Sequence, residues 1–178
     1  MNSKNVIRII VGATVISGVV LLNYWLCGKQ QNTIVWVNLS KVYNEFDLKK
    51  ELEGKFKIVQ TERKKILDSL ELNLKVLGNQ VELTKGKDEV KLYEFQMKRE
   101  EYLTKKEQFE QDNAQLQGDY NQQVLTQINQ YVKEYALSNN YSYVLGADGT
   151  GTLMFANDGK EVTGDILVYI NNKYKGIN

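Results

Sequence analysis

The stretch from Leu52 to Leu77 reads LEGKFKIVQTERKKILDSLELNLKVL, and its apolar residues recur at steps of three and four. The stripe contains Leu52, Phe56, Val59, Ile66, Leu70 and Leu77, and it is widened by Leu67, Leu74 and Val81. This spacing places them on one face of an α-helix, as in a coiled coil. The chain also contains no proline, the residue that most readily breaks a long helix. The stretch therefore predicts a long helix with a narrow apolar seam and a largely solvated surface.

A second seam follows, with apolar residues seven apart: Phe95, Tyr102, Phe109 and Leu116. Between the two seams the pattern fails near Gly78 and Gly86, and Asp88 is a suitable N-cap for a new helix. We therefore predict a helical hairpin over residues 41–138, with Ser40 as its N-cap and its tip at about 78–88. Several polar residues fall on the predicted seams and favour a flexible hairpin over a rigid scaffold: Arg63, Asn73, Arg99, Lys106 and Asn113.

Strand-like sequence flanks the hairpin on both sides. A β-branched and aromatic run predicts one strand at 33–39, and runs at 141–147 and 152–156 predict two more. Asp148 and Gly149 lie between the last two runs and match a tight turn. A short helix is expected to complete a region of strands and helix over 141–175, with Thr163 as its cap.

The chemistry-bearing residues are few. The chain has no histidine and one cysteine, and its 23 Lys+Arg nearly balance 22 Asp+Glu, for a net charge of +1. Three glycines at 146, 149 and 151 match neither the P-loop nor the dinucleotide-binding fingerprint. We therefore predict no enzyme activity, no catalytic, metal or cofactor site, no cofactor, and no nucleic-acid partner.

The N-terminal segment is apolar, with Lys4 and Arg8 before an uncharged run from Ile9 to Gly28. Such a run is long enough to cross a bilayer as a helix. We predict a signal-anchor at 1–28 with residues 6–27 in the inner membrane, and residues 29–178 as one domain on its outer side. A cleaved signal peptide and a lipoprotein acylated at Cys27 are the alternatives.

Three short strands in one chain leave open edges and a thin core. Association of several chains around a shared sheet or barrel resolves both problems. The predicted fold class is thus α+β, a long antiparallel helical hairpin on a small β-body shared between chains. The residues expected in that shared body are Val35, Val37, Tyr143, Leu145, Leu153 and Phe155.

The order of these elements resembles the Skp/OmpH family of periplasmic chaperones. The resemblance covers about 33–175 and rests on IVWVNLSKVYNEF, on the charged hairpin, and on a helix start at Val162, Thr163 and Ile166. It implies a homotrimer whose three chains share the β-body and project three hairpins. It also implies an ATP-independent holdase that encloses unfolded outer-membrane proteins, on the periplasmic side of the envelope. The alternative is a membrane-anchored structural coiled-coil subunit of an envelope or secretion complex with a dedicated partner.

Overall fold

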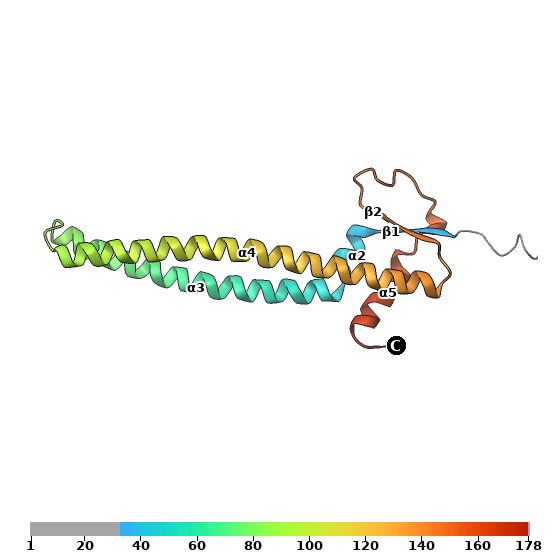
Figure 1. Cartoon of the computed structure of the whole chain (residues 1–178), viewed down its shortest axis with the longest axis horizontal. Coiled ribbons are helices and arrows are strands. Elements are labelled where there is room, and N and C mark those ends of the chain that lie inside the picture. Colours follow the sequence, from blue (N-terminus) through green and yellow to red (C-terminus); the bar gives the residue numbers. More distant parts are fainter. Residues whose placement is uncertain (1–32, 178) are drawn as a thin grey trace, which may run out of the picture.

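A computed structural model describes residues 33–177, which form a long helical hairpin on a small body of strands and helices (Figure 1). In chain order the elements are β1 (Ile34–Asn38), α2 (Leu39–Glu45), α3 (Asp47–Leu83), α4 (Glu89–Ser138), β2 (Tyr143–Ala147), the 3-10 helix η1 (Asp158–Lys160) and α5 (Thr163–Tyr174). The predicted membrane segment at 1–28 lies outside the described residues. Within 33–177, no helix has the length and apolar character that crossing a bilayer requires.

The hairpin consists of α3 and α4, which have 37 and 50 residues. At a rise of 1.5 Å per residue they are about 55 and 75 Å long. The turn between them is shorter than the predicted tip, because α3 continues through Gly78 to Leu83. Gly86 takes the positive φ of 72° that the turn requires. The Asp88 side chain then accepts a hydrogen bond from the Lys91 N–H and begins α4.

The seam of α3 departs from the strict heptad spacing beyond Val59. From Val59 it steps by four to Arg63 and again to Leu67, so Ile66 and Asn73, the strict heptad positions, are exposed. A straight helix drifts against a seven-residue repeat by about 20° per heptad, which explains the shift. The half-buried leucines of α3 beyond Arg63 are Leu67, Leu70, Leu74 and Leu77.

On α4 the half-buried seam contains Phe95, Tyr102, Phe109 and Leu116. Arg99 and Lys106, which we expected in the seam, are exposed, whereas Lys98 and Lys105 are half-buried. The Lys105 ammonium lies 5.6 Å from the centre of the Phe109 ring, so its aliphatic stem covers the side of the seam. Of the predicted polar seam residues, only Arg63 and Asn113 meet between the helices.

The first helix is interrupted close to its start. Asn38, and not Ser40, is the N-cap of α2, since its side chain accepts a hydrogen bond from the Lys41 N–H. Phe46 is extended, with φ −70° and ψ 128°, and separates α2 from α3. We call residues 45–47 the joint, because the hairpin leaves the body there.

The body contains a two-stranded parallel sheet, in which β1 pairs with β2 and Val35 lies opposite Val144. A parallel pair requires a crossover connection, and here the whole hairpin provides it. Val35 and Val37 are buried while Ile34 is half exposed, the alternation expected of a strand with one covered face. The other edge of β1 contacts Glu161 through a single bridge at Trp36.

Residues 148–157 form a loop, and the strand predicted at 152–156 is not present in the described chain. The turn at Asp148 and Gly149 is built differently from a two-residue hairpin turn. Asp148 accepts hydrogen bonds from the N–H and hydroxyl of Thr150, and Gly149 and Gly151 both have positive φ. These bonds direct the chain away from β2, so residues 152–156 do not pair with it.

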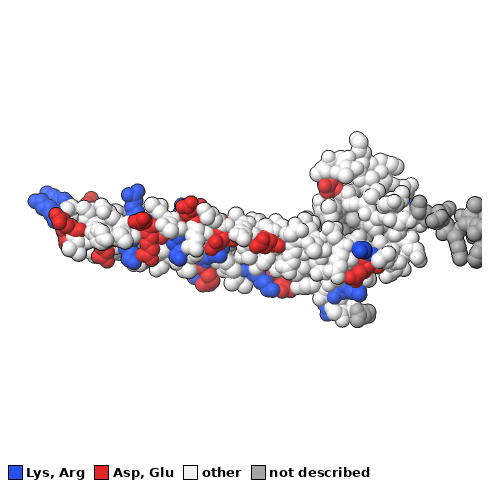
Figure 2. Space-filling view, viewed as in Figure 1, with Lys and Arg blue, Asp and Glu red and all other residues white. Residues whose placement is uncertain are grey.

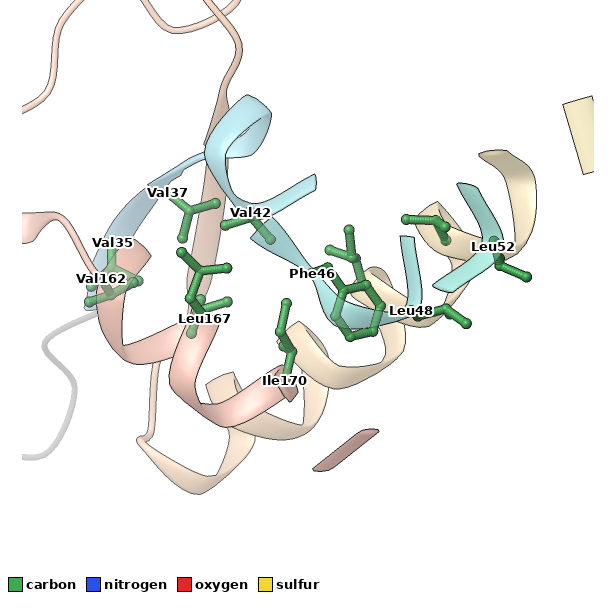
Figure 3. Packing of buried hydrophobic residues seen from close by; sticks show 12 residues of the cluster. Val35, Val37, Val42, Phe46, Leu48, Leu52, Val162, Leu167 and Ile170 are labelled. Atoms are coloured by element: carbon green, nitrogen blue, oxygen red, sulfur yellow. The ribbon is translucent and has the colours of Figure 1, made fainter. Parts of the chain in front are cut away.

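The core lies where the base of the hairpin meets the body (Figure 3). Phe46, Val42, Ile166 and Ile170 are the most deeply buried apolar residues, and Val124 of α4 packs with them. α5 contributes its apolar face to this core. Thr163 begins that helix but does not cap it. Its hydroxyl accepts a hydrogen bond from the Asn38 N–H and donates one to Glu161.

Candidate functional site

Exposed apolar side chains gather in the distal part of the hairpin. Leu83 is 85% exposed and Val90 is 76% exposed, on either side of the turn. Between residues 72 and 97 the exposed large apolar residues are Leu72, Val76, Leu83, Val90, Tyr93 and Met97. Isolated exposed apolar residues are normal on protein surfaces, but this density over one segment is suited to contact with another chain.

Charged side chains of both signs separate these apolar residues. Figure 2 shows Lys, Arg, Asp and Glu intermixed along the hairpin, whereas the loop side of the body is largely free of charge. Several charges are paired within one helix, as in Lys98–Glu101 at 2.7 Å and Lys65–Glu62 at 2.7 Å. Exposed pairs of this kind contribute little to stability and keep the surface hydrated. The hairpin thus offers scattered apolar contacts on a soluble, mixed-charge surface.

A polar cluster crosses the seam midway along the hairpin. The Arg63 guanidinium donates hydrogen bonds to Asn113 and to Asp112, the second over 3.4 Å. It also stacks over the Phe109 ring, 5.4 Å from the ring centre. The Arg63 side chain is 22% exposed, and its partly buried charge is paired with polar groups of α4. Since those bonds form only in one alignment, the cluster fixes the register of the two helices.

The body has an uncovered apolar edge beside the sheet. Phe155 and Met154 in the loop 148–157 are 84% and 92% exposed, and Tyr143 and Leu145 of β2 are also exposed. A shallow pocket of about 180 Å³ lies between this loop and β1, with Trp36 and Leu153 in its wall. The Trp36 indole N–H donates to the Asn157 carbonyl and holds the end of the loop against the strand.

The residues predicted for a shared body do not form one cluster within a single chain. Val35 and Val37 are buried in this chain's own core, and Leu153 is half-buried within the loop 148–157. Tyr143, Leu145 and Phe155 are instead exposed at the uncovered edge. Their place in a body shared between chains stays a prediction.

The described residues contain no constellation suited to metal binding: no three His, Cys, Asp or Glu side chains among 33–177 converge on one point. Two groups at the base of the hairpin have shifted pKa values. Lys175 and Lys50 hold the pKa of Asp47 below its usual value, and a hydrogen bond to Glu51 raises the pKa of Tyr174 to about 12. The Lys175–Asp47 and Tyr174–Glu51 pairs also join the end of α5 to α3, whereas Lys50 and Asp47 pair within α3.

Sequence reasoning missed the contacts that join distant segments. Asn171 of α5 bonds to the backbone at both Glu45 and Asp47, and no local pattern points to it. Asp112 as the partner of Arg63 was missed for a different reason. The seven-residue spacing predicted Asn113 in the seam but assigned no role to the adjacent carboxylate.

The described residues thus form a long solvated hairpin on a small body. The sequence profile of the family described as Outer membrane protein (OmpH-like) matches residues 33–170. The chain is 30% identical to the chaperone protein Skp of Yersinia enterocolitica over 143 residues, which cover 78% of this chain and 85% of that one. It is 27% identical to the chaperone protein Skp of Pectobacterium atrosepticum over 139 residues, or 75% and 82% of the two chains.

The chain belongs to the OmpH/Skp family, as a distant relative that shares most of its length with the Skp chaperones. That family consists of chaperones and not of enzymes. The helical hairpin and the small two-stranded sheet are therefore features of a chaperone-family protein.

Proposed function

We propose that the protein is an ATP-independent holdase of the periplasm, which binds unfolded outer-membrane proteins between the hairpins of three copies. The observation that carries the proposal is the exposed apolar segment at 72–97, interspersed with charges of both signs. An unfolded chain can bind such a surface weakly at many points without a matching pocket. We propose residues 6–27 as an anchor in the inner membrane, which would place the hairpins near clients that emerge there.

The uncovered edge of the body supports the trimer. A two-stranded sheet is marginal by itself, and an apolar strand edge invites pairing with another chain. β2 has its neighbour β1 on one side, and the exposed Phe155 and Met154 lie close in sequence beyond it. Covering these residues with two further copies would bury apolar surface and satisfy the open strand edge. The hairpins of the three copies would then enclose a common space.

The holdase activity is tested with the chain from residue 30 onward. An unfolded outer-membrane β-barrel protein is diluted from denaturant into this chain without nucleotide, and light scattering and complex mass are followed together. Suppressed aggregation, with one client for each three chains, is the expected result. A well-folded trimer that fails to suppress aggregation would refute the holdase proposal while leaving the family fold intact.

A matched pair of variants tests which residues hold the client. The first variant replaces three exposed apolar residues by glutamine: Leu72, Leu83 and Val90. The control replaces the exposed residue before each of them by glutamine: Glu71, Glu82 and Glu89. The first variant is expected to lose most of the suppression and the control to keep it. Equal activity in the two variants would show that the apolar segment does not hold the client.

One observation favours a second candidate, a structural coiled-coil subunit with a dedicated partner. The α3 seam beyond Arg63 is filled by Leu67, Leu70, Leu74 and Leu77, where a flexible hairpin would have more polar residues. Such a seam favours a rigid structural coiled coil. A single folded partner recovered with the full chain, together with no effect on unfolded clients, would support this candidate over the holdase.

A further inference from the structure

The helical backbone is interrupted at the joint, residues 45–47. A single extended residue, Phe46, connects α2 to α3. Phe46 provides no side-chain cap for α3, so the first N–H groups of a 37-residue helix lack the usual local acceptor. An uncapped helix start that follows one extended residue has little within its own segment to fix its direction.

Asn171 of α5 supplies what the joint lacks. Its side-chain oxygen accepts a hydrogen bond of 2.8 Å from the Asp47 N–H, the first of the four N–H groups of α3 that have no acceptor within the helix. Its amide nitrogen donates to the Glu45 carbonyl over 3.3 Å, at the end of α2. One side chain, more than 120 residues away in sequence, thus spans the interruption and bonds to the backbone on both sides of it.

Residues at the C-terminal end of α5 contact the start of α3 and the end of α4. On the α3 side, Lys175 pairs with Asp47 at 2.7 Å and the Tyr174 hydroxyl donates to Glu51. On the α4 side, the Lys173 ammonium lies 3.7 Å from Glu134. The buried Phe46 ring sits edge-on to Tyr131 of α4 and Tyr174 of α5. These contacts place the last turns of α5 across the base of the hairpin.

We propose that Asn171 is a positioning residue and that α5 acts as a strap, which fixes the direction of the hairpin relative to the body. The hairpin is then held at its root and free along its length, where most of its surface is solvated. The angle between the hairpin and the body of one chain is set by this strap and not by the tip. The proposal concerns one chain and does not depend on the identity of a client.

The test measures the distance between hairpin and body in the full chain, kept in solution with a mild detergent. Spin labels are placed on cysteines at two exposed positions, Lys64 and Asp158, in a Cys27→Ser background. Labelled chains are diluted with unlabelled ones so that only distances within one chain are recorded. The parent chain is expected to give one narrow distance distribution by double electron–electron resonance.

Asn171→Ala removes both bonds across the joint and is expected to add a second, displaced population. The ratio of held to released hairpins should fall by about fivefold, the net effect of losing one hydrogen bond. The control is Asn172→Ala at the exposed neighbour, which should reproduce the parent distribution. Thermal unfolding of each variant confirms that the body remains folded. If Asn171→Ala does not fold, the milder Asn171→Ser takes its place. A parent-like distribution in the folded variant overturns the proposal.

Discussion

Replacing Phe46 by alanine is expected to destabilise the protein more than any change on the hairpin surface. Phe46 is fully buried, and Phe→Ala changes in cores cost about 3–5 kcal/mol. Its ring also makes two edge-on contacts, at 6.3 Å to Tyr131 and 5.7 Å to Tyr174, each worth about 0.5–1.5 kcal/mol beyond burial. We therefore expect a loss in the upper part of the range, about 4–5 kcal/mol. Phe46→Leu, which keeps most of the volume, should lose about 1.5 kcal/mol.

The measurement is urea unfolding followed by far-UV circular dichroism, with all variants at the same chain concentration because association shifts apparent stability. Tyr93→Ala serves as the control, since Tyr93 is 65% exposed on the hairpin and should change the unfolding free energy by less than about 0.5 kcal/mol. A loss below about 2 kcal/mol for Phe46→Ala would refute the reasoning. It would mean that the joint is not part of the cooperative core.

Three further predictions concern the body edge, the seam and the base of the hairpin. Phe155→Asp should dissociate the proposed trimer in analytical ultracentrifugation, whereas Met97→Asp on the hairpin should not; a Phe155→Asp variant that stays associated contradicts the shared body. Arg63→Ala should lower the free energy of unfolding in urea by about 1–2 kcal/mol, and Arg63→Leu should recover most of that loss. A leucine variant as unstable as the alanine variant would contradict the expected recovery. The raised pKa of Tyr174, about 12 through its bond to Glu51, gives a stabilisation that is complete below the ordinary value of 10.0 and lost as pH rises toward 12. Urea midpoints at about pH 9 and about pH 11 should therefore differ less in Tyr174→Phe than in the parent. If the two proteins show the same difference, the Tyr174–Glu51 pair is not the source of the stability lost at high pH.

The helical hairpin was predictable because its information is local. The spacing of Leu52, Phe56 and Val59 repeats with the period of the helix, and proline is absent. The limits of this reasoning appear where the helix period and the heptad differ, so that Leu67 lies in the seam and Ile66 does not.

The remaining features depend on contacts between distant segments. No local sequence pattern predicts the parallel pairing of β1 with β2. Strand propensity alone led to the wrong prediction of a strand at 152–156. The joint at Phe46 is set by burial against Tyr131 and Tyr174, which overrides the helical tendency of its neighbours. For the candidate site, the sequence predicted a charged hairpin but not where exposed apolar residues gather, because exposure depends on which face turns toward the other helix.

The parallel pairing of β1 with β2 also determines the order in which the protein can fold. Ile34 pairs with Tyr143, so the strand made first during synthesis has no partner until more than a hundred residues have followed it. Closing so long a loop in an unstructured chain is entropically costly and slow. Helices form within about a microsecond. We therefore expect α3 to pack against α4 first, which brings the two strands together before either has paired. The hairpin is thus the folding scaffold of its own body, and mutations that weaken its seam should slow the formation of the sheet.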